Sequence, residues 1–314
     1  MLTIILSEPP ILKYDNMWQG WIGIILFLST SISVLAQHPG QPLDIQGHRG
    51  CRGLLPENTI PAFLEAVRLG VTTLEMDAII SQNGQVVVSH EPFLSHLICH
   101  NAKGEPISEE DEKEYNLYQM SYDEIAQCDC GSKPNPGFPE QENFTAHKPL
   151  LSQVIDTVEQ FVKQEGLSPI RYNIETKSSE EGDDVFHPKP AKFTQLLLSV
   201  IQEKNIQDRT TIQSFDVRTL QEIRKTAPAY PLALLIGNTD SPQENVEKLG
   251  FTPEIYSPHF KLADTSLLDY AREVNMQVVP WTVNEPEDIR SMIELGVDGI
   301  ISDYPNRVIE ITSK

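Results

Sequence analysis

Short apolar runs alternate with helical patterns along the chain from about residue 45 onward. The helical periodicity predicts an early helix over 59–69, with Asn58 as its candidate cap, and later helices over 194–204, 216–226, 242–249, 265–273 and 286–295. The β-rich runs are 45–48, 73–77, 171–175, 211–214, 232–236, 255–257, 277–281 and 299–302. Eight such runs alternating with helices favour an α/β fold, a closed (β/α)8 TIM barrel. The alternative, an open doubly wound sheet, would carry a Gly-rich phosphate loop after the first strand, and the sequence has none there.

One further apolar run is predicted to lie outside the barrel. Asn83-Gly84 is a strong signal for a two-residue turn, and the run 86–90 returns from it antiparallel to 73–80. With a two-residue loop, the register places Asp77 directly opposite His90. The hairpin therefore predicts that these two side chains are neighbours.

The alternating pattern stops between about residues 91 and 149. This stretch contains six prolines, the acidic run 109–112 and three of the four cysteines. Loops of this length are usually functional or disordered. We expect a lid-like insertion without a core of its own and with a solvated acidic run.

The N-terminal 36 residues are predicted to be a signal peptide. Residues 21–35 form an apolar run, and Val34-Leu35-Ala36 places small residues where a signal peptidase cleaves. Met17 is the alternative start, with 1–16 an over-extended beginning. The run is shorter than the ~20 apolar residues that a membrane span needs, and an uncleaved anchor is the alternative. We expect the domain from residue 37 to 314 to be exported, to the periplasm or outside the cell.

Export makes disulfides chemically permissible, and four cysteines allow three connectivities. Within the insertion, Cys99 is expected to pair with Cys128 or Cys130. Cys51 would then be free or paired with the remaining cysteine of the insertion.

The net charge of −21 at pH 7 limits the classes of partner. A nucleic-acid-binding protein needs a basic face, and adsorption to anionic membranes needs one too. We therefore expect no nucleic-acid partner and no stable membrane partner once the signal peptide is removed.

Polar residues gather at the ends of the predicted strands, where α/β barrels present their chemistry. Glu75 and Asp77 share one face of their strand, because side chains alternate with period two, and Glu175 ends the next barrel strand. Carboxylates buried together are costly without a cation. Three of them without Cys or His at ligand spacing favour one divalent cation, Mg²⁺ or Ca²⁺, over zinc.

The neighbouring motifs contribute groups for proton transfer and anion binding. His48 and His90 suit general acid–base catalysis near neutral pH. Arg49 and Lys177 are candidates for binding phosphate. Trp281 either forms an apolar wall for the substrate or fills the barrel rim. For Glu57 and Asn58 we favour helix capping and loop shaping over a role in orienting the site.

The ordered motifs His48-Arg49-Gly50, Pro56-Glu57-Asn58-Thr59, Glu75-Met76-Asp77, His90 and Glu175-Thr176-Lys177 resemble the glycerophosphodiester phosphodiesterase family. The resemblance runs from about Ile45 to about Val308. It implies metal-dependent hydrolysis of a small-molecule glycerophosphodiester to an alcohol and glycerol 3-phosphate, with an inserted subdomain over the barrel mouth. It also implies attack by the glycerol 2-hydroxyl and a cyclic phosphate that water opens, and it leaves open which histidine is the acid.

Two other functions are retained as alternatives. A phospholipase C- or D-like enzyme on the same barrel would act on intact lipid and would need an exposed apolar rim. A non-catalytic protein that binds a phosphate ligand would need no acid–base pair, whereas both His48 and His90 are present.

Overall fold

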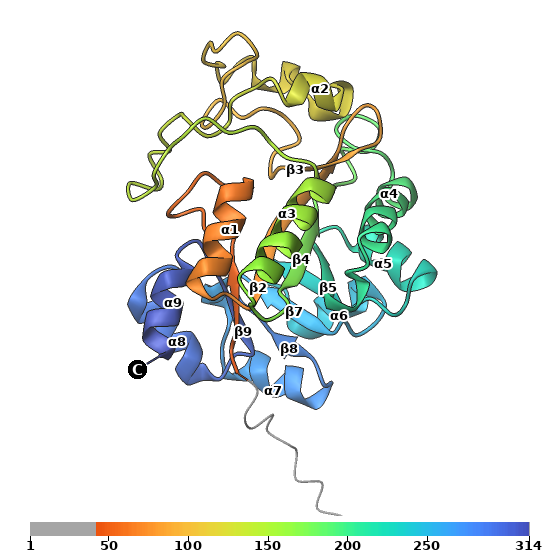
Figure 1. Cartoon of the computed structure of the whole chain (residues 1–314). Coiled ribbons are helices and arrows are strands. Elements are labelled where there is room, and N and C mark those ends of the chain that lie inside the picture. The colour runs from red at the N-terminus through yellow and green to blue at the C-terminus, as the bar shows by residue number, and fades with distance from the viewer. Residues whose placement is uncertain (1–41, 314) are drawn as a thin grey trace, which may run out of the picture. The chain divides into compact units, whose positions relative to one another are not determined.

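The structure is a computed structural model, in which residues 42–313 are described. The predicted signal peptide, residues 1–36, lies outside the described residues. Eight parallel strands form the barrel wall, in the hydrogen-bonded order β8-β7-β6-β5-β4-β2-β1-β9 (Figure 1). The strands are β1 (Asp44–Gly47), β2 (Thr73–Ile80), β4 (Arg171–Thr176), β5 (Thr210–Ser214), β6 (Leu232–Ile236), β7 (Ile255–Pro258), β8 (Gln277–Val278) and β9 (Gly299–Ser302).

The barrel closes between β8 and β9 through backbone hydrogen bonds. The N–H groups of Asp298 and Ile301 donate to the carbonyls of Val278 (2.9 Å) and Pro280 (3.0 Å). The chain beyond β8 continues the wall, since the Trp281 N–H donates to the Pro258 carbonyl of β7 (2.9 Å). The predicted (β/α)8 TIM barrel is therefore confirmed.

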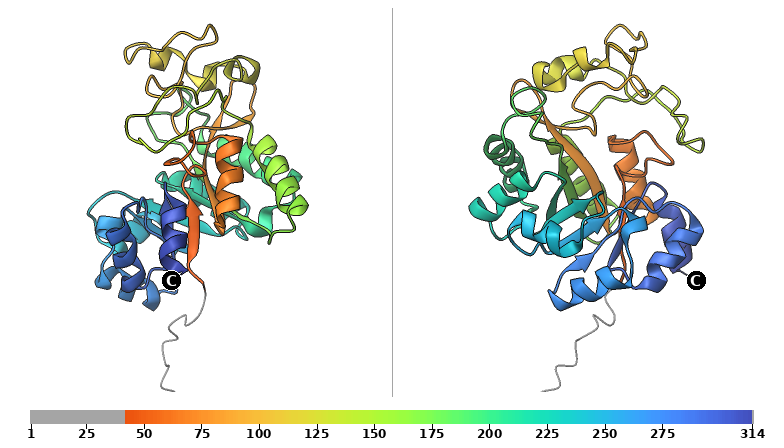
Figure 2. Two further views of the ribbon diagram at one scale, coloured as in Figure 1. Left: turned by 60° about the vertical axis from the view of Figure 1, so that its left-hand side comes forward. Right: turned by 180° about the vertical axis from the view of Figure 1, so that it is seen from behind.

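Helices surround the barrel on its outside (Figures 1 and 2). Five of them have proline in the first turn, where the missing N–H costs nothing. The prediction missed the helices that follow the insertion and the last strand, α3 and α9. The helices are α1 (Ile60–Leu69), α3 (Leu151–Gln164), α4 (Pro190–Glu203), α5 (Val217–Thr226), α6 (Pro242–Leu249), α7 (Thr265–Glu273), α8 (Pro286–Leu295) and α9 (Pro305–Thr312).

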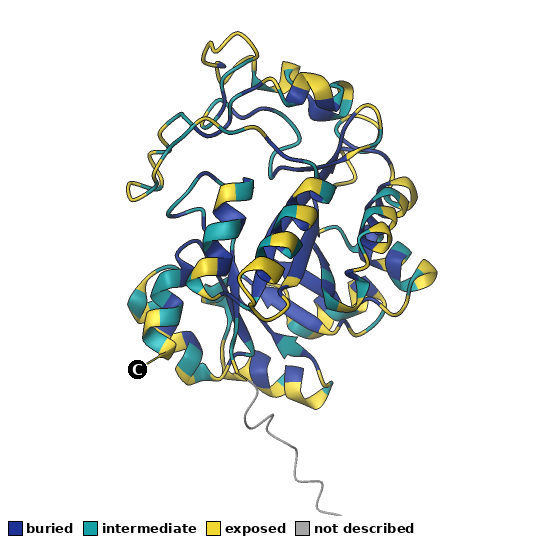
Figure 3. Ribbon diagram, in the orientation of Figure 1, coloured by how far each residue is buried: buried dark blue, intermediate teal, exposed yellow. Residues whose placement is uncertain are grey.

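Short 3₁₀ turns complete the connections outside the insertion: η3 (Gln207–Arg209) and η4 (Phe260–Leu262). The largest apolar cluster lies between the helices and the barrel wall, which is the pattern expected of strands covered by amphipathic helices. Figure 3 shows the buried strands enclosed by helices whose outer faces are exposed.

The interior of the barrel is polar on one side and apolar on the other. Asn173 donates hydrogen bonds to Gln46 (2.8 Å) and Gln213 (2.9 Å), and Gln213 donates to the carboxylate of Glu75 (2.8 Å). The apolar side consists of Ala233, Ile255, Val279 and Ile301. This buried chain of side-chain amides ends at Glu75, so it helps to fix the orientation of that carboxylate.

The hairpin is present, but its predicted register is wrong by one residue. The strand β3 (Val86–Val88) runs antiparallel to β2, with Ala78 opposite Val88. The loop has three residues, 82–84, because Ser81 and Gln85 pair through their backbones and Gly84 adopts a φ of 76°. This is the three-residue hairpin with a left-handed last residue. Asp77 consequently lies opposite Ser89, and His90 follows one position later.

The insertion, residues 91–149, has a small apolar core, so the expectation that it lacks one is wrong. Its largest fully buried members are Leu94, Leu117 and Ile125, which pack against Ile79 and Val87 of the hairpin. Regular structure within it is limited to η1 (Glu112–Glu114), η2 (Leu117–Gln119) and α2 (Tyr122–Ile125). The insertion is therefore anchored on the hairpin by apolar packing.

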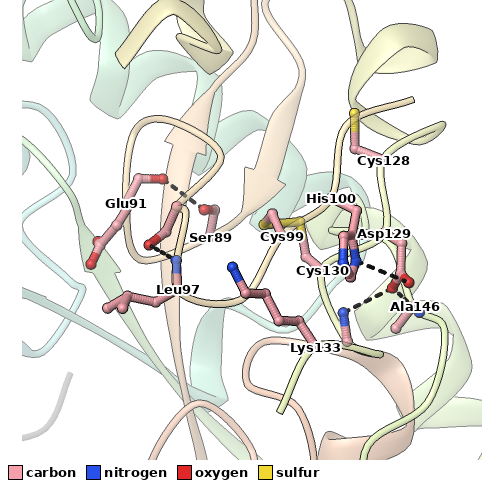
Figure 4. Close-up of a disulfide and its surroundings, with 12 residues drawn as sticks. Ser89, Glu91, Leu97, Cys99, His100, Cys128, Asp129, Cys130, Lys133 and Ala146 are labelled. Carbon is pink, nitrogen blue, oxygen red and sulfur yellow. Dashed lines mark hydrogen bonds and ion pairs between the residues drawn. A yellow bond between two sulfur atoms is a disulfide. The ribbon is translucent and has the colours of Figure 1, made fainter. Parts of the chain in front are cut away.

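A disulfide joins two parts of the insertion (Figure 4). It links Cys99 to Cys130, which is one of the two predicted pairings, and Cys51 and Cys128 are free and buried. Asp129 organises the same turn, because one of its carboxylate oxygens accepts from the N–H groups of Gly131 and Ala146. Within residues 42–313 we find no helix of the length and apolarity that crossing a bilayer requires.

Candidate active site

A cavity of about 170 Å³ opens at the carboxyl ends of the barrel strands. One group of lining residues is polar: His48, Arg49, Arg52, Glu75, His90, Glu175 and Gln213. The other is mainly apolar: Phe215, Leu235, Trp281, Thr282 and Ile301. Six of the eight residues predicted for the site line this cavity, and Asp77 and Lys177 contact those that do.

The predicted carboxylates form a buried cluster. Glu75, Asp77 and Glu175 each offer an oxygen, and these oxygens lie within 4.8 Å of one another. Residues outside the predicted set orient two of them, since Gln213 donates to Glu75 and Asn58 donates to Asp77 (both 2.8 Å). The backbone N–H of Arg49 also donates to the carboxylate of Glu75 (2.8 Å).

This cluster fits a divalent cation. Burial raises the pKa of Glu75 and of Glu175, and in each case the charge on Asp77 raises it further. Burial alone would also raise the pKa of Asp77, but Arg49 and the other cations of the site lower it overall. Asp77 Oδ1 is buried and accepts no hydrogen bond from any described residue. A hard cation such as Mg²⁺ or Ca²⁺ would engage this oxygen and offset the repulsion.

His48 is held by a carboxylate that the sequence analysis missed. Its Nδ1 lies 2.6 Å from Asp303 Oδ1, and this carboxylate can only accept, so Nδ1 carries the proton. The other ring nitrogen, Nε2, is consequently an acceptor when the ring is neutral, and it lies 3.9 Å from Glu75 Oε2. Burial lowers the pKa of His48 to about 4, with Asp303 opposing and Arg52 assisting the shift.

Asp303 is itself fixed by several donors. It accepts from Arg52 Nε (2.8 Å) and Nη2 (3.2 Å) and from Asn284 Nδ2 (2.8 Å). Burial would raise the pKa of Asp303, but His48 and Arg52 lower it well below its usual range. Asp303 directly follows β9, so the strand-end rule that selected His48 could have selected it.

His90 follows β3 and reaches the same cavity. Its Nδ1 contacts the carboxylate of Glu91, and its side chain is 29% exposed, compared with 12% for His48. Burial raises the pKa of Glu91, but the hydrogen bond and the charge of His90 lower it overall. The structure thus brings two histidines together in one cavity, each with a carboxylate at Nδ1.

The predicted cations are already paired with carboxylates. Arg49 Nη1 lies 2.9 Å from Glu57 Oε1, and Arg49 Nε lies 3.3 Å from Asp77 Oδ2. Lys177 Nζ lies 2.8 Å from Glu175 Oε1 and 3.8 Å from Asp77 Oδ1. Burial lowers the pKa of Lys177, but these two carboxylates raise it overall, so its ammonium group is stabilised.

The capping role favoured for Glu57 and Asn58 is wrong. Thr59 caps α1, because its hydroxyl accepts from the Ala62 N–H (3.3 Å), while Asn58 turns toward Asp77 in a left-handed conformation with φ of 56°. Glu57 pairs with Arg49 instead. Burial alone would raise the pKa of Glu57, but Arg49 and Arg52 lower it to about 2. Both residues therefore orient the site.

A buried lysine from the end of the insertion adds a charge that the sequence analysis also missed. The Lys148 side chain is 4% exposed and faces the charges of Glu57 and Glu91. Burial lowers the pKa of Lys148, and these carboxylates oppose the shift. Lys148 lies in the insertion, away from any predicted strand end or motif, so the sequence pattern gave no reason to select it.

Trp281 forms part of the apolar wall of the cavity. Its indole N–H donates to the Ser257 carbonyl (2.8 Å), which fixes the ring. Phe215 meets it edge to face at 5.3 Å between ring centroids and is 46% exposed. The two rings give the cavity an apolar side next to the charged one.

Comparisons with known proteins agree with this geometry. The model of the Glycerophosphoryl diester phosphodiesterase family matches residues 48–307. A glycerophosphodiester phosphodiesterase of Caldanaerobacter subterraneus subsp. tengcongensis is 29% identical over 271 residues, which cover 85% of this chain and 96% of that protein.

Solved structures share the fold. A Silicibacter pomeroyi DSS-3 structure matches with a TM-score of 0.78 and 30% identity, covering 87% of this chain and 95% of that one. A phosphodiesterase of Oleispira antarctica, solved in complex with the product sn-glycerol-3-phosphate, matches with a TM-score of 0.69 and 21% identity, covering 87% and 97%. At that identity the second likeness concerns the fold alone.

Proposed function

Because the chain belongs to the glycerophosphoryl diester phosphodiesterase family and is thus a phosphoric diester hydrolase, we propose that it hydrolyses glycerophosphodiesters to an alcohol and glycerol 3-phosphate with His48 and His90 as its acid–base pair. One observation carries this proposal. The buried cluster of Glu75, Asp77 and Glu175 shares one cavity with the Asp303-held ring of His48.

We propose that the three carboxylates hold one divalent cation, Mg²⁺ or Ca²⁺. Bound there, such a cation would supply Lewis-acid chemistry that offsets the negative charge developing on the phosphate. Arg49 and Lys177 border the carboxylates, so they would contact the remaining phosphate oxygens and share that charge. Trp281 and Phe215 would contact the alcohol portion of the substrate.

The hydrogen bonds of the two histidines support different roles. Asp303 keeps the proton of His48 on Nδ1, so Nε2 would accept the proton of the attacking hydroxyl, and the resulting imidazolium would lie against the carboxylate. Glu91 at Nδ1 of His90 would stabilise the protonated ring, which would donate to the leaving oxygen. In this first step the attacking glycerol 2-oxygen bonds to phosphorus as the alcohol leaves, and one proton enters at His48 as another leaves at His90. Water would then open the cyclic phosphate: His90 would accept a proton from the water and His48 would return its proton to the 2-oxygen, which restores both rings and gives glycerol 3-phosphate.

Product analysis tests this function. The protein, incubated with glycerophosphocholine and either metal, should yield glycerol 3-phosphate, detected by ³¹P NMR with a cyclic phosphate as a transient species, and choline, detected by ¹H NMR. Release of phosphocholine instead would place the cleavage on the other side of the phosphate. No turnover of several headgroup variants with either metal would refute the assignment.

Hydrolysis of intact lipid is the second candidate, and one observation favours it. Leu97, Val185 and Phe215 are exposed, and each lies in a connection that follows the carboxyl end of a barrel strand. An apolar rim on that side is what a lipid substrate would contact. Turnover of liposomes faster than of the deacylated diester would favour this candidate, and the reverse order would favour the first.

We also propose that the protein is exported. The disulfide between Cys99 and Cys130 supports export, because such bonds persist in oxidising compartments. Mass spectrometry of the mature protein should find Gln37 at its N-terminus. An intact N-terminus in the native host would contradict the proposed cleavage.

A further inference from the structure

The last part of the insertion is fastened to the loop that follows β1. The side chain of Gln141 donates to the carbonyls of Arg52 (2.6 Å) and Leu55 (3.2 Å), and the Glu142 N–H donates to the Leu54 carbonyl (2.8 Å). We call residues 138–142 the strap. Figures 1 and 2 show the insertion extending over the side of the barrel that carries α1.

Phe138, the aromatic residue of the strap, lies between Arg52 and Tyr304, which flank the His48–Asp303 pair. The guanidinium carbon of Arg52 lies 4.5 Å from the centroid of the Phe138 ring. On the other side, the Phe138 ring lies 6.4 Å from the ring of Tyr304, the residue after Asp303. Gly53 permits this arrangement, because a Cβ there would lie 2.4 Å from the Tyr304 ring.

Arg52 connects this ring to the catalytic histidine. Its Nε and Nη2 bind the two oxygens of Asp303 as a fork, and Nη2 also lies 3.4 Å from His48 Nδ1. Its Nη1 lies 3.6 Å from Glu57. The guanidinium thus fixes the carboxylate that fixes the His48 ring, and one face of the guanidinium rests on Phe138.

We propose that Phe138 is a positioning residue for the hydrolysis, acting through Arg52 and Asp303 on the orientation of His48. This inference rests on the proposed catalytic role of His48. The Arg52 side chain has many rotamers, and a stacked aromatic ring restricts them while attracting the cation. The insertion therefore contributes to the geometry of the reacting groups. A ring that only packs the strap would affect the stability of the protein and not the Arg52–Asp303–His48 chain.

Substitutions at Phe138 separate these two roles. F138L keeps an apolar side chain but removes the aromatic face, so kcat should fall about 3- to 30-fold with KM unchanged. F138Y retains the face and should restore kcat to within about twofold. The matched control is E140Q, in the same strap: Glu140 pairs with Arg307 (2.6 Å) and lies 52% exposed, so kcat should stay within about twofold.

A double-mutant cycle tests the route through Arg52. In an R52Q background, F138L should change kcat by less than about twofold, because the guanidinium that the ring positions is absent. An equal fold-loss in both backgrounds would overturn the proposal, as would an unchanged kcat in F138L. The Tm of each variant is measured as well, so that a fall in kcat caused by lower stability can be distinguished from one caused by lost positioning of Arg52.

A readout without substrate keeps this proposal distinct from the proposed function. The ¹H–¹⁵N signals of the His48 ring, assigned by their loss in H48A, should shift in F138L and R52Q and stay in place in E140Q. Unshifted His48 signals in F138L would refute the positioning role even if the protein hydrolyses diesters. Shifted signals in a protein that hydrolyses none would refute only the proposed function.

Discussion

Replacing Asp303 with asparagine tests the most consequential contact that the structure adds to the site. The carboxylate accepts from His48 and Arg52 on Oδ1 and from Arg52 and Asn284 on Oδ2. An amide can present its oxygen to only one pair of donors. Facing the oxygen toward His48 keeps the Nδ1 proton in place, while the NH₂ group then opposes the donors of Arg52 and Asn284. Facing the oxygen the other way satisfies Arg52 Nη2 and Asn284 and turns the NH₂ group toward His48, whose Nδ1 would then accept. This second orientation opposes only one donor, Arg52 Nε, so we expect Asp303→Asn to remove the negative charge and also to shift the His48 proton to Nε2.

The size of the loss follows from Coulomb's law. Two unit charges about 4 Å apart interact by ~4 kcal/mol at an effective dielectric constant near 20. Arg52 already neutralises part of the Asp303 charge, so we expect a loss of about 2–4 kcal/mol in stabilisation of the protonated His48. At 1.36 kcal/mol per factor of ten, the lost charge alone should lower kcat by about 30- to 1,000-fold, and the changed tautomer of His48 should add to that loss.

The assay is the steady-state rate of glycerol 3-phosphate formation at saturating metal. We expect the loss in kcat, with KM changed by less than about threefold, because Asp303 acts through His48. Asp298→Asn is the matched control: this carboxylate lies before β9 and accepts from the Val278 N–H (2.8 Å), far along the strand from the cavity. A folded Asp303→Asn protein with kcat within threefold of wild type would refute the role of the Asp303–His48 pair.

Four further predictions concern stability and reactivity. Glu175→Gln should raise the Tm of the metal-free protein while lowering kcat at least about 100-fold, because burial already raises the pKa of Glu175; a lower Tm in chelator would contradict the repulsion argument. The pKa of Glu57 is lowered to about 2 in the folded protein, so Glu57 should stabilise the fold fully above its unfolded pKa of about 4.5 and lose this contribution as the pH falls toward 2. In Glu57→Gln, the free energy of unfolding, measured by urea denaturation at a series of pH values, should therefore fall less steeply with acid. An unchanged slope of that free energy against pH would count against the pairing. Reducing the disulfide between Cys99 and Cys130, which lie 31 residues apart, should lower the free energy of unfolding by about 3 kcal/mol. Burial raises the pKa of Cys51 to about 12, so Cys51 should resist alkylation in the native protein at pH 8. Fast labelling of Cys51 would refute its burial.

The sequence predicted the barrel and the residues that local rules can reach. His48 and Glu175 stand at strand ends, and such positions are visible in a single apolar run. The metal cluster could be predicted because period-two alternation already places Glu75 and Asp77 on one face. These inferences needed no knowledge of which distant segments meet.

The residues that were missed depend on contacts between distant segments. Asp303 reaches His48 across 255 positions, and Gln213 reaches Glu75 across 138. The hairpin register failed because the choice between two and three loop residues depends on the left-handed Gly84, which the sequence Asn83-Gly84 allows in either case. The core of the insertion was missed because Leu94, Leu117 and Ile125 follow no regular period, and only the fold gathers them.

The central claim is that Glu75, Asp77 and Glu175 hold the divalent cation on which the hydrolysis depends. The most direct test is a titration of Mg²⁺ or Ca²⁺ into chelator-treated protein, with initial rates of glycerol 3-phosphate formation. The wild type and the control Glu203→Gln, which alters an exposed carboxylate outside the site, should regain full activity along one saturable curve. Asp77→Asn should remain folded and regain less than about 1% of that rate at any metal concentration, because it loses the buried charge that the cation needs. Full activity of the wild type in excess chelator, or the same metal dependence in Asp77→Asn, would contradict the claim.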